Sequence, residues 1–261
     1  MKFHMSKVVK ASGRPGAKKF AAPVKRLTAD SPKSKLEALF RSAPIMRMKE
    51  QICEMGWRQW QRAYVDGNGG NMAVRVGEDI ALCTPTMISK GSLKPEDICL
   101  VDFDGNQILG PKKRTSEILM HLQIMKRRPE VMATCHCHPP YATAFAIAGM
   151  APPNRMLPEF EIFCSVGVAP YRTPGTPELG RLVAELADEH NTILMANHGV
   201  VTLSHTNIEE AYWRMEIVEA YCRTIVIAQN LGKPLNTFTD AQMEDLLNLR
   251  QSFSTVDPRY V

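Results

Sequence analysis

No apolar run in this sequence reaches the roughly 18 residues that a membrane-spanning helix needs. The first 30 residues hold no hydrophobic segment of the kind found in secretory signal peptides, so we expect no export. No two cysteines have C-x-x-C spacing, and the seven that occur are scattered through apolar segments. These absences favour a cytoplasmic protein with reduced thiols and no membrane partner.

Acidic residues are nearly missing from the first 30 residues, which hold eight lysines and arginines beside the single acid Asp30. That segment contributes +7 to a net charge of +5, so the remaining residues sum to −2. A body with this balance is not a general nucleic-acid binder.

The pattern divides the chain in two. Residues 1–44 are predicted to form a basic, flexible extension that carries a short amphipathic helix at about 32–43. That helix either packs on the body or docks to another protein, and the sequence leaves both interpretations open. Residues 45–261 are predicted to form one domain, without internal repeats.

Helical and strand patterns alternate within this domain. Apolar stripes predict helices at 45–65, 115–127, 140–149, 177–190, 208–231 and 240–252. Short apolar or alternating runs predict strands at 71–76, 80–84, 98–103, 131–136, 166–171, 192–196 and 200–203. Strands that come partly as hairpins and partly between helices favour an α/β fold with a mixed, largely antiparallel sheet covered by helices.

Histidines carry the clearest chemical signal. His136 and His138 alternate at the end of an apolar run, and residues i and i+2 of a strand point to the same face. His198 follows another buried-looking run, and Glu117 stands at the head of a helical pattern. A single histidine is more often a structural residue than a ligand. Three histidines with one carboxylate, however, make a plausible set of zinc ligands in which the carboxylate can leave.

Several motifs occur in the order typical of the class II aldolase/adducin family. They are Gly69-Gly70-Asn71-Met72-Ala73-Val74-Arg75, Thr84-Pro85-Thr86, Thr115-Ser116-Glu117 with His121, His136-Cys137-His138, Tyr141-Ala142-Thr143-Ala144 and Asn197-His198-Gly199. Over about residues 46–250 the chain most resembles the L-fuculose-phosphate aldolase branch. The resemblance implies a three-layer α/β/α sandwich over 45–261 and a homotetramer with active sites between subunits.

The resemblance also implies roles for individual residues. It implies a Zn²⁺ ion, or another divalent transition metal, bound by His136, His138, His198 and Glu117. Glu117 would also be the catalytic acid and base. The implied contacts of the substrate phosphate are Asn71, Thr86, Thr115 and Ser116. Hydroxyls at a predicted helix start beside a Gly-rich turn fit such an oxyanion site. Lys112, Lys113 and Arg114, just upstream, either add positive potential or form a solvated loop.

The activity implied is cleavage of a deoxyketose 1-phosphate, of the fuculose or rhamnulose type, to dihydroxyacetone phosphate and lactaldehyde. The alternatives are a sugar-phosphate epimerase or decarboxylase of the same family, or a non-catalytic adducin-like interaction domain. Some aldolases of this family are carried in bacterial microcompartments through a short amphipathic helix. Residues 32–43 therefore suggest a microcompartment shell as a partner.

Three departures from the family pattern bear on the substrate. Met87 stands where the aldolases tend to have glycine, so we expect it to crowd the phosphate loop. Thr115 replaces a serine. The aldolases use a tyrosine of a neighbouring subunit near the segment that here reads Glu159-Phe160-Glu161. No tyrosine occurs in this segment, so Tyr171, Tyr260 and Glu159 are the candidate proton donors. His121, one helical turn after Glu117, is predicted to support the metal site from behind.

Overall fold

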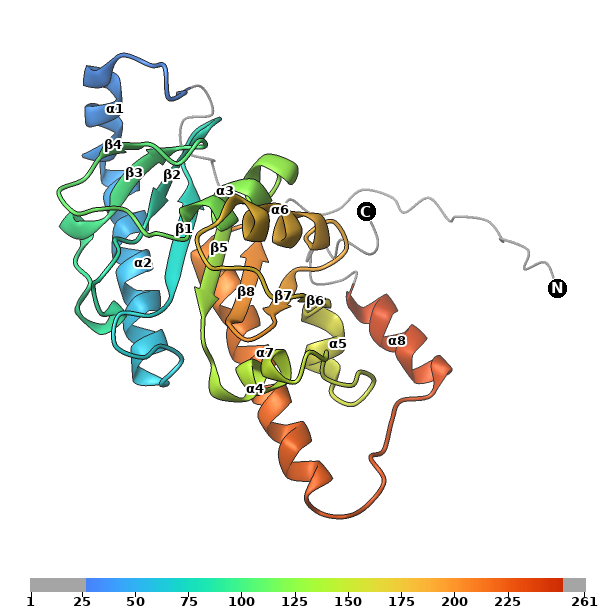
Figure 1. Ribbon diagram of the computed structural model, residues 1–261. Coiled ribbons are helices and arrows are strands. Elements are labelled where there is room, and N and C mark those ends of the chain that lie inside the picture. The colour runs from blue at the N-terminus through green and yellow to red at the C-terminus, as the bar shows by residue number, and fades with distance from the viewer. Residues whose placement is uncertain (1–26, 251–261) are drawn as a thin grey trace, which may run out of the picture.

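One eight-stranded sheet runs through the molecule in the order β4-β3-β2-β1-β5-β8-β7-β6 (Figure 1). The computed structural model describes residues 27–250, so the predictions for residues 1–26 and 251–261 lie outside the described part. All neighbouring strands are antiparallel except β6 and β7. The predicted mixed, largely antiparallel sheet is therefore confirmed. The strands are β1 Asn71–Arg75, β2 Ile80–Cys83, β3 Cys99–Asp102, β4 Gln107–Leu109, β5 Ala133–Cys137, β6 Val166–Ala169, β7 Thr192–Met195 and β8 Gly199–Ser204.

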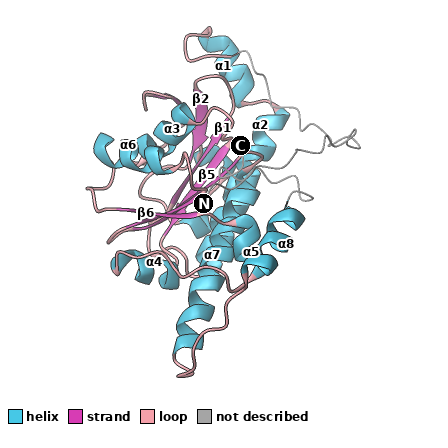
Figure 2. Cartoon of the chain, turned by 90° about the vertical axis from the view of Figure 1, so that its right-hand side faces the viewer, coloured by secondary structure: helices cyan, strands magenta, loops and turns pink. Residues whose placement is uncertain are grey.

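Helices cover both faces of this sheet and give the predicted α/β/α layers. The helices are α1 Lys33–Phe40, α2 Ala43–Gln61, α3 Ile118–Arg127, α4 Pro140–Ile147, α5 Pro158–Phe163, α6 Pro177–Leu186, α7 Ile208–Gln229 and α8 Asp240–Arg250. Figure 2 shows α3 and α6 on one side of the strands and α2 and α7 on the other. Successive residues of β1 follow the strand alternation, because Met72 and Val74 join the α2–α7 core whereas Ala73 joins the α3–α6 core.

The structure differs from the sequence prediction at the start of α3, which begins at Ile118 rather than at 115. Arg114 forms an isolated bridge with Pro85, and the Thr115 N–H donates to Thr84 O at 3.0 Å. Because this backbone pairs with the end of β2, it cannot be helical. Two further elements, β4 and α5, were absent from the prediction; with three and six residues, they are too short to show a period.

Helix α1 packs on the body. Leu36 and Leu39 are buried in the same core as α2 and α7. The predicted boundary at residue 44 stays a prediction. Among residues 27–250, no helix combines the length and the apolar character needed to cross a bilayer.

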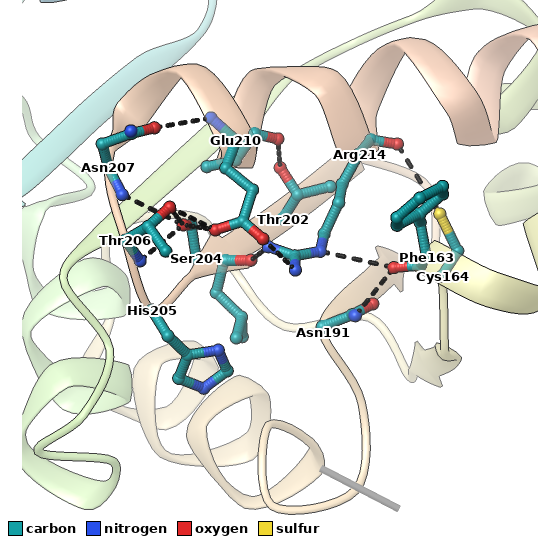
Figure 3. Close-up of polar contacts among 12 residues, drawn as sticks. Phe163, Cys164, Asn191, Thr202, Ser204, His205, Thr206, Asn207, Glu210 and Arg214 are labelled. Atoms are coloured by element: carbon teal, nitrogen blue, oxygen red, sulfur yellow. Dashed lines mark hydrogen bonds and ion pairs between the residues drawn. The ribbon is translucent and has the colours of Figure 1, made fainter. Parts of the chain in front are cut away.

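A closed polar cluster anchors the end of β8 to α7 (Figure 3). The buried guanidinium of Arg214 donates to Leu203 O at 2.7 Å, Phe163 O at 3.3 Å and the Glu210 carboxylate at 2.7 Å. Glu210 also accepts from the hydroxyl of Ser204 at 2.5 Å. The side chains of this cluster thus satisfy one another.

Candidate metal centre

The three predicted histidines meet where strands β5 and β7 end and β8 begins. His136 lies in β5, His138 follows it directly, and His198 lies in the turn between β7 and β8. Their potential ligand atoms all lie within 4.8 Å of one another. Nδ1 of His136 contacts Val200 O at 2.8 Å, which leaves Nε2 as the nitrogen that faces the cluster.

The Asn-His-Gly turn makes this convergence sterically feasible. Asn197 has φ 54°, a left-handed conformation that asparagine tolerates better than most residues. A Cβ at Gly199 would lie 2.6 Å from His138 Cδ2 and 2.7 Å from Cys137 O. Only glycine therefore lets β8 start this close to β5 and its histidines.

Glu117 completes the cluster from the N-cap position of α3. Its Oε1 lies 3.2 Å from His198 Nε2, and its Oε2 lies 3.4 Å from His136 Nε2. Burial disfavours the charged carboxylate, but the two histidines outweigh burial and hold the pKa of Glu117 well below its usual range. Burial, aided by His136, lowers the pKa of His138 to about 4, so at neutral pH its imidazole is neutral and can act as a ligand.

The hydrogen bonding of this cluster is incomplete. Among the described residues, His136 Nε2, His138 Nε2 and Glu117 Oε1 are buried atoms without a hydrogen-bond partner. Buried polar atoms are nearly always paired, so a concentration of orphaned donor and acceptor atoms indicates a missing ligand. Three imidazoles and a carboxylate fit a divalent transition metal such as zinc.

A cavity of about 170 Å³ opens beside the cluster. Its walls include all four residues predicted to bind phosphate, together with Glu117 and His138. These four are Asn71, Thr86, Thr115 and Ser116. The basic residues upstream do not line it: Lys112 and Lys113 are exposed, and Arg114 donates to Gly105 O and Thr115 O.

The loops around the cavity contain one residue that the sequence prediction missed. The buried ammonium of Lys90 donates to Asn68 O at 3.1 Å and to Ile88 O at 2.7 Å, which ties two loops beside the cavity together. Met87, expected to crowd the cavity, is 77% exposed and does not line it. It has φ 59°, the conformation that glycine adopts most easily, so it strains the loop and leaves the cavity open.

Of the three candidate proton donors, two lie in the described part of the chain. Tyr171 is half exposed, Glu159 lies in the first turn of α5, and Tyr260 falls outside the described residues. None of the described candidates lines the cavity.

Known proteins resemble this chain over most of its length. Residues 50–226 match the family model of the Class II Aldolase and Adducin N-terminal domain. The L-fuculose phosphate aldolase of Methanococcus maripaludis is 38% identical over 182 residues, which cover 69% of this chain and 96% of that protein. The 3-oxo-tetronate 4-phosphate decarboxylase of Haemophilus influenzae is 31% identical over 208 residues, 78% of this chain and 97% of that protein. A solved L-fuculose 1-phosphate aldolase superposes with a TM-score of 0.71 at 27% identity, covering 82% of this chain and 99% of that one.

Proposed function

The chain belongs to the class II aldolase and adducin family, and from that premise we propose that it is a zinc-dependent aldolase that cleaves a deoxyketose 1-phosphate of the fuculose or rhamnulose type. The products would be dihydroxyacetone phosphate and lactaldehyde. Its relatives are lyases, and the chain is an enzyme of this superfamily. The observation that carries the proposal is the set of orphaned ligand atoms beside a cavity lined by hydroxyl groups.

In this proposal His136, His138 and His198 hold the metal. When bound, a divalent ion supplies Lewis-acid chemistry, which polarises a carbonyl and stabilises negative charge on oxygen. Glu117 lines the cavity and is an anion at neutral pH, so its carboxylate stands where it can take a proton from a substrate carbon or return one. The hydrogen bond from Asn71 Nδ2 to Glu117 Oε2, 2.7 Å long, holds that carboxylate at the cavity wall.

The hydroxyl groups that line the cavity would bind the phosphate. Thr115 Oγ1 accepts a hydrogen bond from the Glu117 N–H at 3.3 Å, so its own hydrogen is free for an oxyanion. Thr86 and Ser116 also line the cavity, and Ser116 directly precedes the N-cap of α3. Both hydroxyl donors and the positive end of the helix dipole favour an anionic group there.

A decarboxylase acting on a 3-oxo acid phosphate is the second candidate. It is favoured by the relative from Haemophilus influenzae and by the lack of a tyrosine in segment 159–161. The zinc-loaded protein should be incubated with ketose 1-phosphates and with 3-oxo-tetronate 4-phosphate, while triose phosphate and CO₂ are both measured. Triose phosphate released from a ketose 1-phosphate without CO₂ supports the aldolase. Release of CO₂ from 3-oxo-tetronate 4-phosphate, together with the three-carbon ketose phosphate that remains, and no cleavage of the ketose 1-phosphates, supports the decarboxylase. Neither product from a fully metal-loaded protein would contradict both.

The assembly proposed is a homotetramer with active sites between subunits. Large exposed apolar side chains, Trp57, Trp60 and Trp213, offer surface for such contacts. Light scattering on the purified protein tests it, and a monomer at micromolar concentration would contradict it.

Encapsulation in a microcompartment rests on the resemblance of residues 32–43 alone. Unchanged co-purification with shell proteins after deletion of residues 1–44 would end that hypothesis.

A further inference from the structure

A chain of buried hydrogen bonds leads away from Glu117 behind the cavity. Asn71 Nδ2 donates to Glu117 Oε2 at 2.7 Å, and Asn71 Oδ1 lies 2.5 Å from His121 Nε2. His121 Nδ1 lies in turn 2.6 Å from the hydroxyl of Thr134. The four residues come from β1, α3 with its N-cap, and β5, so the chain crosses three elements. His121 and Thr134 are completely buried and do not line the cavity.

The direction of each bond follows from the one before it. A carboxylate only accepts, so Asn71 must turn its NH₂ toward Glu117 and its carbonyl oxygen toward His121. His121 must therefore carry its proton on Nε2. Burial, aided by the neighbouring His136, lowers the pKa of His121 to about 3, so the ring is neutral and Nδ1 must accept from Thr134. Glu117 thus sets the tautomer of His121 through Asn71, and the Thr134 hydroxyl supports that tautomer by supplying the donor that Nδ1 needs.

The direction of these hydrogen bonds decides which amide atom of Asn71 faces the cavity. Its Nδ2 makes one hydrogen bond among the described residues, yet an amide nitrogen carries two hydrogens. Asn71 also lines the cavity, so the second hydrogen can meet an anionic oxygen of a ligand. A reversed amide would instead turn its oxygen toward both the carboxylate and that anion.

We propose that His121 and Thr134 are positioning residues that fix the Asn71 amide so that its N–H groups face both Glu117 and a phosphate oxygen of the substrate. This inference rests on the proposed sugar-phosphate lyase, whose phosphate it assigns to Asn71. The sequence prediction gave Asn71 and His121 separate tasks. In the proposal Asn71 and His121 act together and link the phosphate site to the Glu117 carboxylate.

Thr134 offers a matched pair of variants. Thr134→Val keeps the shape and suits a strand but removes the hydroxyl, so His121 Nδ1 loses its donor and the other tautomer becomes competitive. Thr134→Ser keeps the hydroxyl but removes a methyl group, so it controls for packing. Inorganic phosphate, titrated calorimetrically into the zinc-loaded protein, is the probe. We expect binding to weaken about tenfold in Thr134→Val and by less than about twofold in Thr134→Ser.

Two further measurements test the route. Nitrogen-15 spectra of histidine-labelled protein should show His121 protonated on Nε2 in the wild type and in Thr134→Ser. In an Asn71→Ala background, Thr134→Val should have no additional effect on phosphate binding. The proposal is overturned by equal weakening in the Val and Ser variants, by wild-type binding in Thr134→Val, by an Nδ1-protonated His121, or by an effect that persists without Asn71.

These outcomes are separable from the fate of the proposed function. Phosphate affinity and the tautomer are measured without any sugar, so they do not depend on which substrate is cleaved. If the Val and Ser variants differ as expected but no ketose phosphate is cleaved, only the assigned substrate fails. If triose phosphate is released but the two variants bind phosphate equally, only the positioning role fails.

Discussion

Two buried polar clusters lie at opposite ends of the paired strands β5 and β8. Ala133 pairs with Ser204 at one end, and Cys137 pairs with Val200 at the other, roughly 13 Å away at the rise of a strand. Around Ser204, Arg214 and Glu210 satisfy each other and the surrounding carbonyls (Figure 3). Around Cys137, the histidines and Glu117 leave ligand atoms unpaired.

The contrast shows that burial of a polar side chain does not by itself indicate function. Arg214 is 2% exposed and His136 is 0% exposed, so depth does not distinguish them. The distinction lies in whether the hydrogen-bonding capacity is used up. A closed cluster contributes to the fold, whereas an open cluster with a cavity beside it has capacity left for a ligand. The following predictions test whether the two ends act independently.

The largest effect is expected from His198→Ala at the open end. This variant removes one of the three metal-holding imidazoles, so we expect metal content to fall well below one per chain and turnover to fall to background. Metal analysis and the triose-phosphate assay measure both. His205→Ala is the matched control, since His205 lies at the closed end and accepts from Arg128 Nη2 at 3.2 Å. Equal metal loss in both variants would contradict the distinction between the open and the closed end.

Glu117→Gln should lower kcat by about 10²- to 10⁴-fold, the range typical of a lost acid or base. Glutamine has the same shape and can still accept the hydrogen bond from Asn71, so part of the metal binding should survive. Metal content and kcat should thus separate, unlike in His198→Ala. Near-normal turnover in this variant would contradict the role assigned to Glu117.

The convergence of the three histidines at the open end could be predicted from the sequence because local rules produce it. Alternation in a strand aligns His136 with His138, and the Asn-His-Gly turn places His198 beside them. The link from Thr134 through His121 to Asn71 joins three elements, and no local pattern encodes which of their side chains meet. Lys90 could not be predicted for the same reason, because one of its carbonyl partners, Asn68, lies 22 residues away in the chain. The late start of α3 likewise arises from a tertiary bridge between Arg114 and Pro85.

Arg214→Met should lower the free energy of unfolding by about 3–5 kcal/mol, because it leaves the buried Glu210 carboxylate without its counter-charge. Chemical denaturation measures this loss. Arg58→Met, which breaks an exposed pair with Glu54, is the control and should change stability by less than about 1 kcal/mol. The folded fraction of Arg214→Met should still bind metal stoichiometrically. A metal-free but folded variant would show that the closed end supports the site.

Metal removal should destabilise the wild type by an amount set by metal concentration and affinity. At a free zinc concentration one hundred times the dissociation constant, the stabilisation is about 2.7 kcal/mol. Thermal unfolding with and without chelator measures it. The increment should be equal in the wild type and Arg214→Met and absent in His198→Ala. An increment that persists in His198→Ala would place the metal elsewhere.

The smallest effect is expected from Ser204→Ala at the closed end. The Ser204 hydroxyl donates to Glu210 and accepts from the Thr206 N–H at 3.0 Å, while Glu210 keeps its bond to Arg214. Loss of one member of a network that stays charge-balanced should cost about 1 kcal/mol in unfolding free energy, against less than about 0.5 kcal/mol for the exposed Ser92→Ala. Because the two ends lie farther apart than coupled residues usually do, Ser204→Ala and His198→Ala should add within about 0.5 kcal/mol. A larger interaction energy in the double variant would mean that β8 transmits strain from the anchor to the metal site.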